Sequence, residues 1–194
     1  MIAGIVLGGG AGRRMGGVDK LALTVGGIPL LDRVLAAARP VCGRLVVVGP
    51  PRPTTVPGVD FVVEDEPGGG PVPAVAAGLA RVGPCDLVVV VAGDLPLVTE
   101  AHLRDLVHGL DSPHVDAAAA DHQGSPNPLL AAYRAAVLRS TAVALAAGHP
   151  AARLLPRATV VVDLGPATLN GNRPQDLAAA ELLVRSAPPP GHEG

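Results

Sequence analysis

The sequence predicts an α/β domain with three layers, α/β/α, in which helices cover both faces of a mostly parallel mixed sheet. Short runs of Val, Ile and Leu alternate with longer Ala- and Leu-rich stretches whose apolar residues recur at helical spacing. The short runs are almost continuously apolar, which is typical of strands buried on both faces. Because 194 residues suit one domain of this class, we expect a single domain over 1–187 and a disordered, proline-rich tail at 188–194.

The expected strands and helices alternate along the chain. The first strand, 2–7, starts at once and ends at a glycine cluster, and the strand at 87–91 lies in an apolar run of six residues. The other strands are apolar runs bounded by polar or turn residues: 45–48, 60–63, 117–120, 128–133 and 159–162. The helices have apolar residues at every third or fourth position: 29–38, 73–81, 100–110, 135–147 and 174–186, with a short helical turn near Arg153.

Composition and charge argue against several classes of protein. The formal net charge is −2, with one Phe, one Tyr and no Trp, whereas nucleic-acid-binding proteins usually carry a basic surplus and stacking aromatic residues. Cys42 and Cys85 are far apart, which argues against a disulfide scaffold and a CxxC metal site. No basic leader precedes the first strand, and no apolar run is long enough to cross a bilayer. We therefore expect a cytoplasmic protein with no nucleic-acid and no membrane partner.

The segments that follow three strands have the composition of a ligand site. In an open parallel sheet, ligands bind at the carboxyl ends of the strands. Here these ends lead into a glycine- and arginine-rich loop at 8–20, an acidic and glycine-rich loop at 64–70, and Gly93 with Asp94. Glycines let backbone N–H groups approach a phosphate, and Arg and Lys neutralise it. The first loop therefore predicts a phosphate cradle; a flexible turn with solvated arginines is the alternative.

The spacing within the first loop excludes two common phosphate-binding loops. A dinucleotide fingerprint that begins at Gly10 requires glycine where Met15 stands. A Walker A loop requires glycine followed by Lys and then Ser or Thr, and this pattern is absent. The cradle is therefore of another type.

Asp94 is the candidate metal ligand. It comes just after an apolar strand, and Pro96 stiffens the turn that follows, so the sheet would hold the carboxylate at the crevice. Mg²⁺ binds through few carboxylates together with phosphate oxygens or waters, which suits this position. An Asx turn or the start of a helix capped by Thr99 is the alternative. The six histidines show no zinc-site spacing, which makes a zinc enzyme improbable.

A series of short motifs runs along the chain in a fixed order. It comprises Leu7-Gly8-Gly9-Gly10, Arg14-Met15-Gly16, Asp19-Lys20, Gly70-Pro71, Gly93-Asp94-Leu95-Pro96, Asn127-Pro128-Leu129, Tyr133-Arg134 and the Asn-Gly-Asn-Arg-Pro-Gln-Asp-Leu segment at 170–177. This set resembles the molybdenum cofactor guanylyltransferase family of nucleotidyltransferases and covers nearly the whole chain up to the tail. The resemblance implies a Rossmann-like nucleotidyltransferase domain that transfers GMP from GTP to the terminal phosphate of molybdopterin or the molybdenum cofactor, with Mg²⁺ as cofactor and pyrophosphate as leaving group.

The resemblance also implies which residues handle the nucleotide. The backbone of the glycine loop would hold it, at Leu7, Gly8, Gly9 and Gly10. Arg14 and Lys20 would neutralise the triphosphate, with Arg13 as a helper, and Asp65 would contact the base or the ribose. Because the acceptor phosphate is already anionic near neutral pH, no strong general base is needed, and catalysis depends on positioning and charge neutralisation.

The remaining implied roles concern the metal, the acceptor and the partners. Asp94 would place Mg²⁺ at the α-phosphate, and Asn172 would be a second ligand through its amide oxygen. Asn127 and Asn170 are the candidate acceptor-binding residues. Besides GTP and molybdopterin, the resemblance implies transient contacts with proteins that deliver the molybdenum cofactor.

Several positions depart from the family pattern. Pro73 and Ala74 replace the expected small pair near the base site, Asn127 stands where His commonly precedes Pro, and Arg173 replaces a helix-capping Thr, a loss of about 1 kcal/mol. These departures affect recognition of the base, binding of the acceptor and capping of the last helix more than they affect the transfer reaction.

Three other functions stay open at this stage. A molybdenum cofactor cytidylyltransferase is the nearest, and the Gly9-Gly10 pair and Leu95 favour guanine over it. Another NTP-dependent nucleotidyltransferase, such as one for sugar phosphates, is further away. The non-enzyme alternative is an inactive nucleotide-binding regulatory module, against which the presence of Arg14, Lys20 and Asp94 argues.

Overall fold

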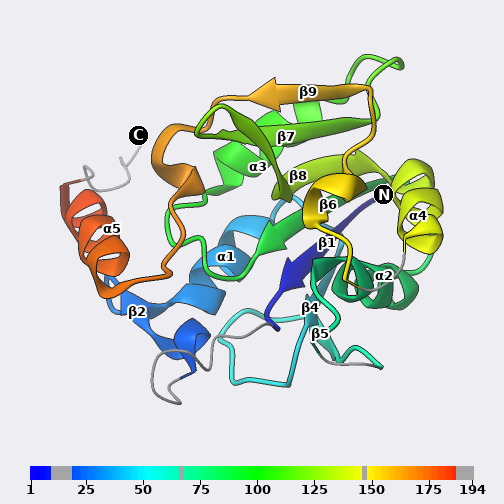
Figure 1. Cartoon of the computed structure of the whole chain (residues 1–194). Helices are drawn as coiled ribbons and strands as arrows, with labels where there is room; N and C mark the ends of the chain where they lie inside the picture. Colours follow the sequence, from blue (N-terminus) through cyan, green and yellow to red (C-terminus); the bar gives the residue numbers. More distant parts are fainter. Residues whose placement is uncertain (10–18, 66–67, 146–147, 187–194) are drawn as a thin grey trace, which may run out of the picture.

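The computed structural model describes residues 1–9, 19–65, 68–145 and 148–186 (Figure 1). Over these residues the chain forms a seven-stranded sheet, ordered β5-β4-β1-β6-β8-β7-β9, and a separate two-stranded ribbon, β2-β3. The strands of the large sheet are β1 (Ile2–Leu7), β4 (Arg44–Val48), β5 (Val59–Val62), β6 (Leu87–Ala92), β7 (Ala117–His122), β8 (Ser125–Arg134) and β9 (Thr159–Val162). The predicted tail at 188–194 lies outside the described residues.

The direction of the strands gathers their carboxyl ends at one edge of the sheet. β1 pairs in parallel with β4 and β6, β4 with β5, and β7 with β9. β8 pairs antiparallel with both β6 and β7, so it runs against its neighbours. The beginning of β8 therefore lies beside the ends of β6 and β7. We call this side of the sheet the carboxyl edge.

Two apolar layers sandwich the sheet, because side chains alternate between its faces. Val6, Val47 and Val91 pack toward α1 (Leu30–Ala38) and α3 (Glu100–His108). Ile5, Val46 and Val90 pack toward α2 (Pro71–Val82) and α4 (Ala135–Ala144). Burial on both faces explains why the strands are continuous apolar runs in the sequence. The α/β fold with three layers and a mostly parallel mixed sheet is confirmed (Figure 1).

The ribbon of β2 (Thr24–Val25) and β3 (Ile28–Pro29) was not predicted from the sequence. It carries α5 (Pro174–Ser186), and Val25, Leu30 and Ala180 form a small cluster between them. The Gly26-Gly27 turn has φ values of 61° and 75°, which glycine adopts at little cost, and it is typical of a two-residue hairpin. Strands of two residues are too short for an alternating pattern to be recognised.

Some boundaries differ from those predicted. β8 begins at Ser125 rather than at 128, because its first residues pair with β7 beyond a bulge between Ala119 and Ala120. The prolines within that stretch concealed it, since proline weakens the sequence signal of a strand. α2 begins at Pro71, two residues before the expected start, and α3 ends at His108. The turn expected near Arg153 is the 3-10 helix η3 (Ala151–Leu154).

No helix within the described residues is long and apolar enough to cross a membrane.

Candidate active site

The glycine segment after β1 lies between the ends of β4 and β6. The Gly8 N–H donates to the Val48 carbonyl at 2.8 Å, and the Gly93 N–H donates to the Leu7 carbonyl at 2.9 Å. A methyl group on Gly8 would lie 2.8 Å from Val47 Cγ1, so a side chain does not fit there. The first residues of the predicted cradle, Leu7, Gly8 and Gly9, therefore lie at the carboxyl edge. Gly10, Arg13 and Arg14 lie outside the described residues.

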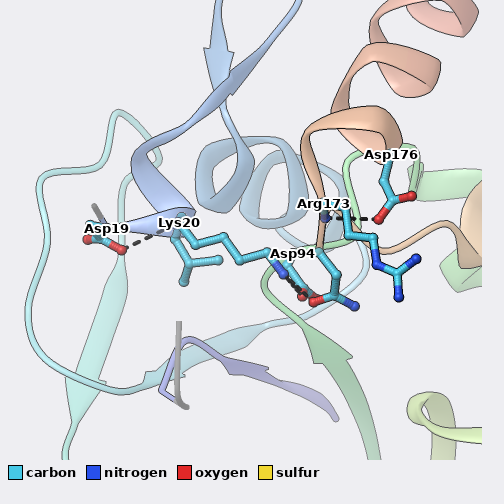
Figure 2. A network of polar contacts seen from close by, with 7 residues as sticks. Asp19, Lys20, Asp94, Arg173 and Asp176 are labelled. Carbon is cyan, nitrogen blue, oxygen red and sulfur yellow. Dashed lines mark hydrogen bonds and ion pairs between the residues drawn. The ribbon is translucent and has the colours of Figure 1, made fainter. Parts of the chain in front are cut away.

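Lys20, Asp94 and Asn172 meet at this edge although they are far apart in the sequence. Figure 2 shows the Lys20 side chain extending from the 3-10 turn η2 (Lys20–Ala22) to the Asp94 carboxylate, with which it forms an ion pair. The same Lys20 Nζ donates to Asn172 Oδ1 at 2.6 Å. The side chains of Lys20 and Asp94 are 11% and 21% exposed, so the pair is partly shielded from water. The structure thus brings together three residues that the sequence pattern selected.

Backbone contacts hold these three residues in place. Asp19 caps η2, since its Oδ1 accepts from the Leu21 N–H at 3.2 Å. The Gly171 N–H donates to the Asp94 carbonyl at 2.8 Å, which fixes the segment before α5 against the end of β6. A methyl group on Gly171 would lie 2.8 Å from Leu177 Cδ2, so a larger residue there would require the Leu177 side chain to shift.

The capping deficit expected at Arg173 is partly compensated. Asp176 Oδ2 accepts from the Arg173 N–H at 2.9 Å, as Figure 2 shows. This contact satisfies a backbone donor at the start of α5 in the absence of a Thr side chain. The Arg173 guanidinium points away from the Lys20 ammonium (Figure 2).

Arg52 is a residue of this region that sequence reasoning missed. It lies in the connection between β4 and β5, and its Nε donates to Asp19 Oδ2 at 2.6 Å while its Nη1 donates to the Pro50 carbonyl at 3.0 Å. The hydrogen bond from Arg52 lowers the pKa of the Asp19 carboxyl. Arg52 therefore supports the residue that caps the turn of Lys20. The sequence offers no signal for the contact beyond a lone arginine in a proline-rich loop.

Of the two described acidic residues after β5, Glu64 faces the glycine segment more closely than the expected Asp65. A methyl group on Gly9 would lie 3.5 Å from Glu64 Oε1, whereas Asp65 is exposed. Burial raises the pKa of Glu64. Its Oε2 is buried and has no hydrogen-bond partner among the described residues. At the end of β5, the Glu64 carboxylate therefore lies beside the glycine segment, whereas the Asp65 carboxylate is exposed.

A hollow of about 260 Å³ lies on the other side of Asp94, at the start of β8. Both candidate acceptor-binding residues, Asn127 and Asn170, line it. His122, which sequence reasoning missed, lines it as well. Asn127 Oδ1 accepts from the Leu129 N–H at 2.9 Å, and its NH₂ group has no hydrogen-bond partner within the part of the chain that the structure describes. The other lining residues are Ala92, Ser125, Pro126, Pro128 and Leu129.

The sequence profile of the MobA-like NTP transferase domain matches residues 4–161. The chain belongs to this family. A molybdenum cofactor guanylyltransferase of Cereibacter sphaeroides is 36% identical over 191 residues, which cover 94% of this chain and 96% of that protein. A probable molybdenum cofactor guanylyltransferase of Chloroflexus aggregans is 31% identical over an alignment that covers 95% of this chain and 95% of that protein.

Solved structures show the same fold as this member of the family. Molybdopterin-guanine dinucleotide biosynthesis protein A from Archaeoglobus fulgidus matches with a TM-score of 0.74 at 24% identity, over 96% of this chain and 100% of that chain. 2-C-methyl-D-erythritol 4-phosphate cytidylyltransferase from Thermus thermophilus matches with a TM-score of 0.68 at 23% identity, over 95% and 100%. At this identity the likeness establishes the fold, and the chemistry has to be argued from the site.

The chemistry of the site suits a divalent metal ion of the kind that nucleotidyltransferases use. Asp94 and Asn172 both direct an oxygen at a single nitrogen, Lys20 Nζ, so these two oxygens converge on one cation-sized position. Carboxylate and amide oxygens are hard ligands, and phosphate oxygens and waters can complete the coordination.

Proposed function

We propose that this family member is a molybdenum cofactor guanylyltransferase, which transfers GMP from GTP to the terminal phosphate of molybdopterin or the molybdenum cofactor. One observation carries the proposal: Lys20, Asp94 and Asn172 converge beside the glycine segment, in a chain that matches relatives of that name over nearly its full length. The cytoplasmic location and the transient contacts with delivery proteins stay predictions.

The reaction is an in-line displacement at phosphorus. An oxygen of the acceptor phosphate forms a bond to the α-phosphorus of GTP, the bond from that phosphorus to the bridging oxygen of the β-phosphate breaks, and pyrophosphate leaves with the electron pair. No proton has to be removed from an attacking phosphate that is already anionic. Positioning of the two substrates and neutralisation of their charges are what the protein has to supply.

The site residues that the structure describes divide this task between them. The backbone of Leu7, Gly8 and Gly9 contacts the nucleotide, and Lys20 pairs with the triphosphate and the leaving pyrophosphate. Asp94 and Asn172 hold Mg²⁺, which when bound neutralises charge on the phosphates. Gly10 and Arg14, outside the described residues, complete the cradle in this proposal, with Arg13 as a helper.

The acceptor enters from the hollow at β8. Asn127 and Asn170 offer amide groups to its polar ring system or phosphate, and the hollow opens beside Ala92, two residues before Asp94. The acceptor phosphate would thus approach the nucleotide from the side opposite Glu64 and Asp65.

Guanine selectivity is assigned to the end of β5. Guanine presents an N–H and an amino group side by side, and a carboxylate accepts from both. Asp65 is the proposed contact and Glu64 its neighbour. A site built to bind one base edge rejects other bases strongly, because its polar groups are then unpaired. We expect Asp65→Asn to reduce the preference for GTP over CTP, with turnover of CTP unchanged.

Pyrophosphate release, measured with each of the four nucleoside triphosphates in the presence and absence of molybdopterin, tests the function. We expect release with GTP, Mg²⁺ and molybdopterin together, and none without molybdopterin. Release with CTP instead would make the protein a cytidylyltransferase. Binding of GTP without release under any condition would identify a regulatory module.

A further inference from the structure

Lys20 is the only lysine in the 194 residues, and every other basic side chain of the Lys and Arg class is arginine. The two side chains differ physically. Arginine is a wide planar fork, whereas lysine carries a compact ammonium with three N–H groups on a flexible four-carbon stem. A chain that uses arginine elsewhere has a compact and mobile cation at this one position.

The Lys20 ammonium lies where the metal of the proposed reaction has to bind. Its Nζ pairs with the Asp94 carboxylate and donates to Asn172 Oδ1 at 2.6 Å. These two oxygens are the proposed metal ligands. The ammonium and a metal ion cannot both occupy the position between the Asp94 carboxylate and Asn172 Oδ1. Two cations so close together would repel each other in a site that is partly shielded from water.

We propose that the Lys20 ammonium occupies the cation position between Asp94 and Asn172 in the nucleotide-free protein, and that the triphosphate draws it away, so that metal and nucleotide bind together. This inference rests on the proposed function in taking Asp94 and Asn172 as the metal ligands. Beyond that assignment, the inference fixes an order: the Lys20 ammonium leaves the two ligands before the metal ion binds them.

The local structure allows the exchange without a change of fold. Asp19 caps η2 and Arg52 holds Asp19, so the Lys20 backbone is anchored while its side chain can rotate. A metal ion without nucleotide has to displace the ammonium and leave it without a partner. A triphosphate supplies several anionic oxygens for the ammonium, which frees Asp94 and Asn172 for the metal. By linkage, nucleotide and metal then increase each other's affinity by the same factor.

Mn²⁺ binding followed by electron paramagnetic resonance, with no nucleotide present, tests the competition. We expect Lys20→Met to bind Mn²⁺ at least about tenfold more tightly than wild type, since the competing cation is gone. Arg173→Met is the matched control, because it removes one nearby positive charge from a side chain that points away from the site (Figure 2). It should change the affinity by less than about twofold. Equal Mn²⁺ affinities for wild type and Lys20→Met would overturn the proposal, as would an equal gain in both variants.

Nuclear magnetic resonance of the wild-type protein gives a second test that does not depend on any variant folding. Labelling with lysine that carries ¹³C at Cε gives one signal, because Lys20 is the only lysine. Mg²⁺ alone should leave this signal in place, whereas Mg²⁺ with inorganic triphosphate should shift it. A shift with Mg²⁺ alone to the same position contradicts the exchange.

These tests separate the inference from the proposed function. Inorganic triphosphate and Mn²⁺ carry no base, so a protein with another nucleotide preference would still give both expected results. Asp94→Asn combined with Lys20→Met should abolish the tight Mn²⁺ binding. Its persistence would show that the ligands, and with them the inference, are wrong.

Discussion

The two halves of the carboxyl edge differ in charge. The nucleotide side, from Asp94 toward β5, carries ion pairs and carboxylates, among them Lys20 with Asp94 and Arg52 with Asp19. The acceptor side, at the start of β8, is lined by amides, prolines and small residues, with His122 as its titratable group. In the proposed reaction we therefore expect the nucleotide side to handle the charges of the transfer and the acceptor side to recognise shape and hydrogen-bonding groups. Substitutions on the two sides should therefore affect different kinetic constants.

Asp94→Ala should give the largest effect, because this carboxylate lies where the two sides meet. We expect kcat/KM to fall by at least about a hundredfold with every acceptor, since charge stabilisation by a metal is worth several kcal/mol. The unfolding temperature should change little, because the side chain lies outside the apolar core. Pyrophosphate release and thermal unfolding measure the two effects, and near wild-type turnover would remove Asp94 from the site.

Asn170→Ala should affect the acceptor side alone. Loss of one hydrogen bond, worth about 1 kcal/mol, is expected to raise the KM for molybdopterin about fivefold. The KM for GTP should stay unchanged and serves as the internal control. If both constants rise equally, the division of the edge into two sides is wrong.

Arg52→Ala should lower kcat/KM for GTP by less than Asp94→Ala does, because Arg52 acts on Lys20 only through Asp19. An ion pair of this kind contributes up to about 1 kcal/mol, so we expect a two- to fivefold fall in kcat/KM for GTP. The Lys20 Cε signal should also shift, and Arg52→Lys should restore part of the activity. Arg81→Ala is the matched control, since Arg81 pairs with Asp60 away from the site. A similar loss in the control would show that Arg52 has no positioning role.

Glu64→Gln should have the smallest effect, and this effect should be on the stability of the fold rather than on the rate of transfer. Burial raises the pKa of Glu64, so the folded state favours the protonated form, and this contribution to stability is lost as the pH rises through the raised pKa. At pH values above the raised pKa the wild type holds an ionised, partly buried carboxylate that the variant lacks. We expect the unfolding temperature of the variant to rise by about 1–2 °C at pH 7 and not at pH 4. Asp65→Asn, at the exposed neighbour, should not change it, and an equal change at both pH values would contradict the assignment.

The sequence predicted the sheet well because each of its central strands is apolar on both faces. The same logic predicted that residues after Leu7 and after β6 would meet, since parallel strands end at one edge. Lys20 and Asp94 were selected on this basis, and the structure brings them together with Asn172.

The residues that sequence reasoning missed have long-range contacts. Arg52 meets Asp19 across 33 positions, and no periodic pattern signals such a pair. Asp65 was chosen in place of Glu64, because both residues follow the end of β5 and the sequence does not show which of two adjacent acidic loop residues turns inward. The Gly26-Gly27 turn was a readable hairpin signal that lacked flanking strands of recognisable length.

The reversed direction of β8 leaves a tight turn at the edge where the acceptor would bind. Gln123 and Gly124 form this turn with φ values of 55° and 81°, between the end of β7 and the start of β8. Extra residues inserted there would lengthen the wall of the hollow without changing the pairing of either strand. The turn is thus a site at which acceptor range can evolve, or be engineered, independently of the phosphate chemistry: grafting longer hairpins at Gln123 and Gly124 should create new acceptor preferences on an unchanged nucleotide-binding half.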